Sequence, residues 1–375
     1  MRHTGNITGA FADGAILFPL LAALVWQTGM NGAILLATAG AAYIMAGLVF
    51  RVPMSVQPLK SVVVAALALG ASAAEIHISG LTVGLACLAL SFCYADRLAA
   101  IVPRHLVQGL QLGLGIILMM KGIKWGMDGL SDPLFSIAVF ALLAGGIIWA
   151  SRRSSLPVMG WLATGGLLMA IVFAFKAGPA VPFPFVPEQA GFRFDVILAL
   201  VLPQLALTLT NSVVATHDVA QRYFGPAAQR VRPSRLLRSI GIGNVLSAAI
   251  GGLPFCHGSG GLTAHMKGGA KSWHMNLVIG GFLLFLAVIS VFFGMSFIPA
   301  YPKILMATLI FATGYFHMQL AAPGWKTPPL RIVLVLMGLT ALLTQNMLLV
   351  LLAGIVVEIL RSAALSLTEK RANGS

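Results

Sequence analysis

Long apolar runs, separated by short polar turns, follow one another along almost the whole chain. A helix needs about 20 mostly apolar residues to cross a bilayer, and many of the runs approach that length. Charged residues make up only 9% of the sequence, whereas soluble domains carry about 25%. A water-soluble fold of this composition could not cover its surface with polar groups. We therefore predict an all-α, polytopic, multi-pass integral membrane protein that has lipid as a partner.

The runs predict fourteen membrane-spanning segments, two of which are too short to cross a bilayer alone. The third and tenth segments, 58–73 and 259–270, are short and are interrupted by Pro or Gly. Broken segments at matching places in two halves are typical of inverted-repeat transporters with a midplane site. We expect both to be half-helices preceded by short extended stretches. The fourteen segments are 10–27, 31–50, 58–73, 78–95, 106–122, 134–150, 156–175, 194–212, 235–251, 259–270, 275–294, 297–316, 329–344 and 346–361.

The segments divide into two halves of seven. In the first half, Pro53 follows Pro19 by 34 residues, and in the second half Pro254 follows Pro203 by 51. The second interval is longer, and the polar loop 217–234 has room for its additional residues. We expect a first repeat over residues 1–176, a linker over 177–193, a second repeat over 194–361 and a cytoplasmic tail over 362–375.

The distribution of Lys and Arg predicts the orientation. With the N-terminus inside, eighteen of the 24 basic residues fall on the inner side and five on the outer side, and Lys60 falls within the membrane. The positive-inside rule favours this orientation, with both termini cytoplasmic. The basic residues lie in short loops and form no face interleaved with aromatic side chains, so no nucleic-acid partner is expected despite the net charge of +14.

The first broken segment combines helix-starting residues with a buried cation. Pro58 suits the first turn of a helix, Gln57 precedes it, and Lys60 and Ser61 follow. Free N–H groups and a partial positive charge gather at a helix start. Lys60 would need a negative partner there, and no acidic residue lies in either broken segment. The substrate could supply that charge, or Lys60 could extend to the membrane surface.

The second broken segment is rich in small residues. His257 is followed by Gly258, Ser259, Gly260 and Gly261. Ser259 can act as N-cap, and the glycines would let an anion approach the backbone closely. Two facing half-helix starts would form a site of amide donors for a negative ligand.

Polar residues in three further positions could complete the site. Gln204, Thr208 and Asn211 recur at helical spacing, and they could line a cavity or make interhelical hydrogen bonds. Asp13 is a proton-coupling candidate or a helix cap. His257 could bind substrate or carry protons, or it could be a hydrogen-bonded packing residue.

At these residues the sequence resembles the molybdate transporters related to the SulP sulfate permeases. The resemblance lies in Val52-Pro-Met-Ser-Val-Gln-Pro-Leu-Lys-Ser61, in Leu202-Pro-Gln204 with Leu209-Thr-Asn-Ser212, and in Pro254-Phe-Cys-His-Gly-Ser-Gly-Gly-Leu262. It implies a core domain of spans 1–4 and 8–11, which moves against a gate domain of spans 5–7 and 12–14, and it is compatible with a homodimer. The chain ends soon after its last expected span, so no STAS domain is expected.

The resemblance and the residues together predict a secondary active transporter of a tetrahedral oxyanion, molybdate or sulfate, working by alternating access, in which a proton is a candidate coupled ion. A nucleobase or other small-anion permease of the same fold, and an anion channel, remain alternatives. We find no nucleophile–base pair and no metal cluster, so we expect no enzyme activity, metal site or cofactor. We expect the protein in a bacterial plasma membrane.

Overall fold

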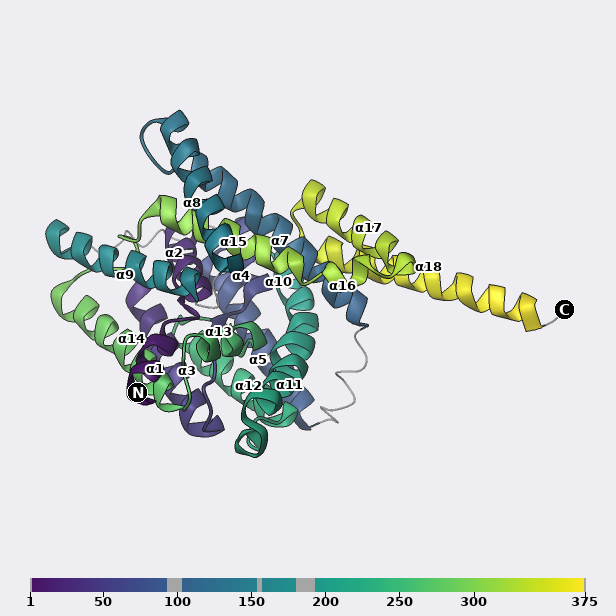
Figure 1. Ribbon diagram of the computed structural model, residues 1–375, viewed down its shortest axis with the longest axis horizontal. Helices are drawn as coiled ribbons and strands as arrows, with labels where there is room; N and C mark the ends of the chain where they lie inside the picture. Colours follow the sequence, from purple (N-terminus) through teal and green to yellow (C-terminus); the bar gives the residue numbers. More distant parts are fainter. Residues whose placement is uncertain (1, 93–102, 154–156, 180–192, 374–375) are drawn as a thin grey trace.

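The computed structural model describes residues 2–92, 103–153, 157–179 and 193–373, and the chain folds there into packed helices joined by short connections (Figure 1). The helices of the first half are α1 (Arg2–Ala10), α2 (Gly14–Thr28), α3 (Gly32–Phe50), α4 (Lys60–Leu69), α5 (Ala73–Phe92), α7 (Arg104–Met127), α8 (Pro133–Arg153) and α9 (Val158–Ala177). Those of the second half are α10 (Phe194–Leu207), the π-helix η1 (Thr208–Val214), α11 (Ala215–Phe224), the 3₁₀ turn η2 (Gly225–Ala228), α12 (Pro233–Ala249), α13 (Ser259–Lys267), α14 (His274–Phe293), α15 (Lys303–Gln319), α16 (Ala322–Trp325), α17 (Pro328–Thr344) and α18 (Met347–Asn373). Two short strands complete the fold, β1 (Gln57–Pro58) and β2 (Phe255–Cys256).

Over the residues that the structure describes, each apolar run that predicts a span overlaps a helix. Among the described residues, eight helical segments are long and apolar enough to cross a bilayer, which confirms the helical, multi-pass architecture. α4 and α13 are among the shortest of the matching helices, with 10 and 9 residues. Both directly follow an extended stretch, as expected of half-helices.

Three regions differ from the sequence-based expectation or lie outside it. The expected loop 217–234 is largely helical, because no Gly or Pro interrupts the chain before Gly225 and α11 buries Thr216 and Ala220. The expected tail 362–375 continues α18 as far as Asn373. Of the expected linker, residues 180–192 lie outside the described residues. Among the cysteines, Cys87 and Cys256 are buried free thiols, and Cys93 lies outside the described residues.

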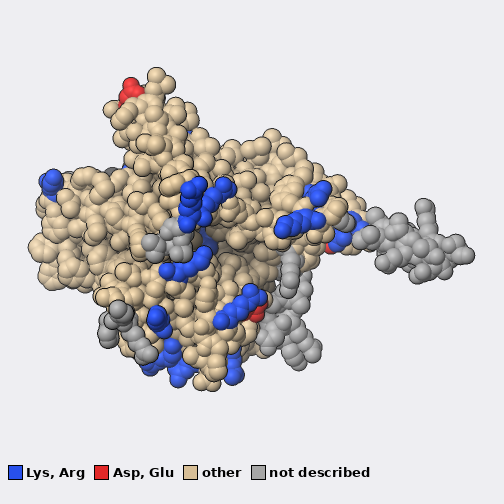
Figure 2. Space-filling model, in the orientation of Figure 1, with Lys and Arg blue, Asp and Glu red and all other residues tan. Residues whose placement is uncertain are grey.

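The exterior of the molecule is apolar and its interior holds many polar side chains. Leu134, Phe292 and Leu343 are about four-fifths exposed, at 80%, 83% and 79%, whereas Gln57 and Asn244 are fully buried. Figure 2 shows a mainly uncharged face on which Lys and Arg lie in separate clusters across the middle and the lower part, and Figure 1 places α1, α11 and α12 in the lower part. A largely apolar exterior of this kind suits a protein surrounded by hydrocarbon.

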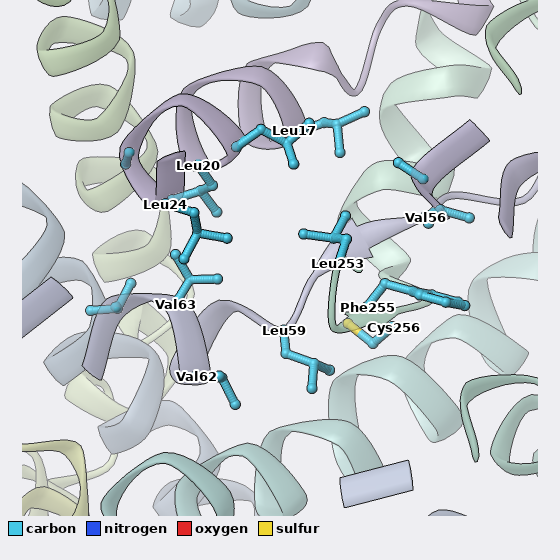
Figure 3. Close-up of a cluster of buried hydrophobic side chains, with 14 of the residues drawn as sticks. Leu17, Leu20, Leu24, Val56, Leu59, Val62, Val63, Leu253, Phe255 and Cys256 are labelled. Atoms are coloured by element: carbon cyan, nitrogen blue, oxygen red, sulfur yellow. The ribbon is translucent and has the colours of Figure 1, made fainter. Parts of the chain in front are cut away.

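The two extended stretches meet inside the molecule as an antiparallel pair. Gln57 lies opposite Cys256 and Pro58 opposite Phe255, and the Leu59 amide donates to the Pro254 carbonyl at 2.9 Å. Leucines of α2 lie beside the first turns of α4, with the β2 residues nearby, and enclose the pair in apolar side chains (Figure 3).

Side chains satisfy the backbone groups that the extended stretches leave free. Asn276 accepts from the Met54 amide at 3.1 Å and donates to the Met54 carbonyl at 2.7 Å. Asn244 does the same for Phe255, at 2.9 and 2.6 Å. Thr38 Oγ1 accepts from the Leu253 amide. An unsatisfied backbone group in hydrocarbon costs several kcal/mol, so these side chains make the broken segments possible.

Close helix pairs depend on glycine. α3 packs along α14, and a side chain at Gly280 would collide with the Gly40 carbonyl and with Ile44 of α3. Gly281, the next residue, faces open space and is exposed.

Gly280→Ala is therefore expected to destabilise the protein by about 1–3 kcal/mol, the usual cost of overpacking, and to lower its melting temperature in detergent. Gly281→Ala is the matched control and should leave the melting temperature unchanged or raise it, since Ala favours helix over Gly. Equal behaviour of the two variants in a thermal-shift assay would contradict this packing.

Candidate functional site

A cavity of about 380 Å³ lies at the tips of α4 and α13, within the range of small-molecule pockets. Residues at the start of α2, together with α4, η1 and α13, line one wall. The end of α8, the start of α9 and α15 line the other. The polar residues that line it are Asp13, Lys60, Ser151, Asn211, Ser259, Thr263, Lys267, Thr313 and His317.

Lys60 is the first residue of α4 and lines the cavity with only 7% of its surface exposed. Its burial excludes the alternative in which it extends to the membrane surface. Among the described residues, no carboxylate oxygen lies within 4.0 Å of its ammonium group. A lysine in such a position is costly and marks a functional site by default.

The start of α4 differs from the expected free amide tip. The Gln204 side-chain oxygen accepts from the Ser61 amide at 2.9 Å and from the Val62 amide at 3.4 Å, and the Gln204 nitrogen donates to Thr208 at 3.0 Å. Gln204 thus caps α4 from the neighbouring helix and is itself held by Thr208, and neither residue lines the cavity. Pro58, expected in the first helical turn, lies instead in β1, because pairing with Phe255 holds it extended.

Asn211 faces the cavity because the helix changes its winding. Residues 208–214 form a π-helix, which places more residues in each turn and so rotates Asn211 away from the Gln204–Thr208 stripe. π-helical turns are frequent at functional sites. Asn211 Oδ1 accepts from the Ser259 hydroxyl at 2.9 Å, which joins η1 to the tip of α13.

The start of α13 is open on one side and tightly packed on the other. The N-cap is Gly258 rather than Ser259, because the Ser55 hydroxyl already binds the Gly258 amide and carbonyl, at 3.0 and 2.7 Å. Gly260 faces open space at the cavity. A side chain at Gly261 would collide with Asp13 and Gln57. The exposed side of this tip is therefore the one available to a ligand.

Asp13 precedes α2 without capping it by its side chain. One carboxylate oxygen accepts from Gln57 Nε2 at 2.6 Å, and the other is buried without a hydrogen-bond partner. Asp13 also lines the cavity. Asp13 therefore occupies the N-cap position of α2 without a side-chain cap. Its buried carboxyl, with one free oxygen, lines the same cavity as Lys60.

His257 is held away from the cavity. Its Nδ1 donates to the Ser55 carbonyl at 2.8 Å, so in the neutral ring Nε2 accepts from the Ser239 hydroxyl at 2.9 Å. Its ring also packs edge-on against Phe50. This geometry corresponds to the packing alternative.

The wall formed by α8, α9 and α15, together with the end of α13, contributes residues that sequence reasoning did not single out. His317 and Thr313 lie on α15, and the His317 Nδ1 donates to Gln111 of α7 at 2.6 Å. Lys267, at the end of α13, adds a second positive charge. Isolated polar residues within long apolar helices carry no spacing signal, so only the packing of α15 against α2 and α7 identifies them.

Comparison with known proteins places the chain among transporters. A family model described as "Molybdate transporter of MFS superfamily" matches residues 5–118 and 196–316. Molybdate transporter 1 of Chlamydomonas reinhardtii is 25% identical to this chain, with 82% of each covered. Molybdate transporter 2 of Arabidopsis thaliana is 23% identical and covers 79% of this chain and 73% of its own length.

Solved structures share the fold. The transmembrane domain of the cyanobacterial bicarbonate transporter BicA aligns with a TM-score of 0.59 at 17% identity, over 96% of this chain and 97% of its own. The murine anion transporter Slc26a9 in the inward-facing state aligns with a TM-score of 0.65 at 12% identity, over 95% and 68%. The resemblance to molybdate transporters related to the sulfate permeases is confirmed, as is the expectation of a transporter rather than an enzyme. Because the family model matches well over half of its residues, this chain belongs to the molybdate transporter family.

Proposed function

We propose that this anion transporter carries molybdate, or sulfate of the same shape and charge, as a secondary active transporter working by alternating access. The observation that carries the proposal is Lys60, a buried ammonium group without an ion pair among the described residues, at the tip of α4 and facing a cavity. Hydroxyl and amide groups of Ser259 and Asn211 line the same cavity. A tetrahedral oxyanion supplies the missing charge and accepts hydrogen bonds on all sides.

The proposed fourteen spans form a 7+7 inverted repeat, in which α2–α5 and α7–α9 correspond to α10, α12–α15, α17 and α18. Helix contacts support it, because they occur in matching pairs. α3 packs on α14 as α5 packs on α12, and α2 packs on α9 as α10 packs on α18. The family match, in two blocks of similar length, agrees with two related halves.

The same contacts support a core domain of spans 1–4 and 8–11 and a gate domain of spans 5–7 and 12–14. α7 and α15 pair at the centre of the gate, and contacts between the domains run largely through α2 and α10. The cavity lies between the two domains, with Lys60 and Ser259 on the core side and His317 on the gate side. Movement of one domain past the other would open the cavity to either side.

Long-range contacts support the proposed sidedness. Arg193 binds Glu75 at 2.7 Å and Lys303 donates to the Asp128 carbonyl, and all four lie in regions proposed as outer. Asn6 binds Ser272 on the proposed inner side. Cytoplasmic termini, a bacterial plasma membrane and a homodimer stay predictions; the relatives named above come from an alga and a plant.

An anion fits this cavity better than the alternative substrates. Asp13 is the only acidic residue that lines it among the described residues, so the second half offers no carboxylate to bind the edge of a nucleobase. Protein donors discriminate poorly between molybdate and sulfate, because the two dianions share shape and charge. Accumulation against a gradient would distinguish a transporter from an anion channel.

Lys60→Ala should reduce the affinity for molybdate roughly 10- to 100-fold, since a hydrogen bond to a charged group contributes about 1.5–3 kcal/mol. The measurement is uptake of labelled molybdate and sulfate into proteoliposomes, with uracil as the rival substrate. Lys124→Ala changes an exposed lysine of α7 outside the cavity, and this control variant should take up molybdate with the same affinity as the unsubstituted protein. Uptake of uracil without either oxyanion would disprove the proposed substrate class.

Asp13 is the proposed proton-coupling group, because a dianion entering beside its carboxylate favours protonation. An inward proton gradient should stimulate uptake, and Asp13→Asn should remove the stimulation while keeping the hydrogen bond from Gln57. Uptake at several external pH values, with internal pH fixed, measures this. Asp195→Asn at the exposed start of α10 is the control. Full stimulation in Asp13→Asn would rule the role out.

The cavity is proposed to open to the inner side, since Ser151, Pro157 and Lys267, which lie at helix ends assigned to the inner side, line it. A cysteine replacing Thr263 should therefore react with a membrane-impermeant thiol reagent in inside-out vesicles, and molybdate should slow the reaction. Lys124→Cys should react in right-side-out vesicles instead. Equal labelling of Thr263→Cys from both sides, untouched by molybdate, would contradict the proposed access.

A further inference from the structure

A second cavity, of about 430 Å³, lies on the outer surface of the core domain, between α3 and α12. α3 packs along α14 and α12 along α5, and the two helices contact each other only sparsely. A groove therefore remains between them. Small residues such as Ala41, Ala42 and Gly243 line it, so it is deep as well as long.

The walls of the groove are apolar along most of its length. Met45 of α3, Ile242 and Leu246 of α12 and the C-cap residue Ile250 are each more than half exposed, at 56%, 52%, 63% and 59%. Along α12 the groove runs from Arg235 to Ile250, which at about 1.5 Å per residue spans roughly 22 Å. One leaflet of a bilayer has a hydrocarbon thickness of about 15 Å. The groove is thus long enough for one acyl chain.

Positive charge lies at one end of the groove only. Arg235 and Arg238 line it where α12 begins, and none of the described residues that line it is acidic. The Arg238 guanidinium lies 5.2 Å from the Phe92 ring centroid, which orients it beside the groove. Guanidinium groups bind phosphate in a bidentate manner. The end that carries them faces the proposed inner leaflet, where anionic lipids and basic residues attract each other.

We propose that this groove is a binding site for an anionic phospholipid, with the phosphate on Arg235 and Arg238 and one acyl chain between α3 and α12. The groove also reaches the back of the second broken segment. Phe255 of β2 lines it, and so does Ser239, which is hydrogen-bonded to His257. A bound lipid therefore packs against the residues that hold β2 in place and stabilises that arrangement.

The test is a lipid titration of the full chain in detergent, read by native mass spectrometry and melting temperature. Phosphatidylglycerol is compared with phosphatidylcholine that carries the same acyl chains. Phosphatidylglycerol should bind at least tenfold more tightly and should raise the melting temperature. Arg235→Gln combined with Arg238→Gln should remove the preference. Arg222→Gln combined with Arg230→Gln, which removes the same charge outside the groove, should preserve it.

A second pair of variants tests the acyl chain without changing charge. Ala41 is exposed and lines the groove, so Ala41→Phe should fill it and weaken phosphatidylglycerol binding several-fold while the protein stays folded. Leu48→Phe lies on α3 outside the groove lining and is the control. Equal binding of the two lipids, or an equal loss of the phosphatidylglycerol preference in both double-arginine variants, would overturn the proposal. Full competition by millimolar glycerol phosphate would also overturn it, because that result would indicate a site for a free anion.

Discussion

The rest of the structure depends on satisfying the backbone of two extended stretches inside an apolar molecule. Half-helices and strands within hydrocarbon leave amides and carbonyls without helical partners, at several kcal/mol for each. Neighbouring helices supply Asn276 for Met54, Asn244 for Phe255 and Gln204 for the start of α4. The first extended stretch supplies Ser55 for the start of α13. The antiparallel pairing of β1 with β2 satisfies others. Only with those groups satisfied can two helix starts be held in the interior.

That requirement also explains why the two helix starts are unequal. Gln204 occupies the amides of Ser61 and Val62, so α4 contributes to the cavity mainly through the ammonium group of Lys60. α13 keeps an open face at Gly260 and Ser259. In the proposed transporter, therefore, the first half supplies charge and the second supplies backbone and hydroxyl donors, rather than two equivalent dipoles. A buried full charge has a stronger attraction for a dianion than a partial helix charge has.

Local chemistry in the sequence was enough to predict where the broken segments lie. The two prolines of the first segment, and Pro254 with the glycines after His257 in the second, disfavour a continuous helix at these two places, and Lys60 stands out because its surroundings are apolar. The π-helix at 208–214, the capping of α4 by Gln204 and the approach of His317 depend on which helices pack together. A single sequence contains no signal for that packing. Asn211 and Gln204 share a helical face by spacing, yet tertiary contacts send them to different partners.

The position of His317 bears on how the two proposed domains would communicate. It lies on α15, in the proposed gate domain, and its ring nitrogen is fixed by Gln111 of α7. Its side chain lines the cavity that Lys60 and Asp13 line from the proposed core domain. A dianion held on the core side by Lys60 would attract donors across the cavity, and those donors belong to helices of the gate. Substrate would thus form a bridge between the two proposed domains. A ligand shifts a conformational equilibrium only through such state-dependent contacts, so the sharing of the cavity between both domains is what would allow substrate to drive alternating access.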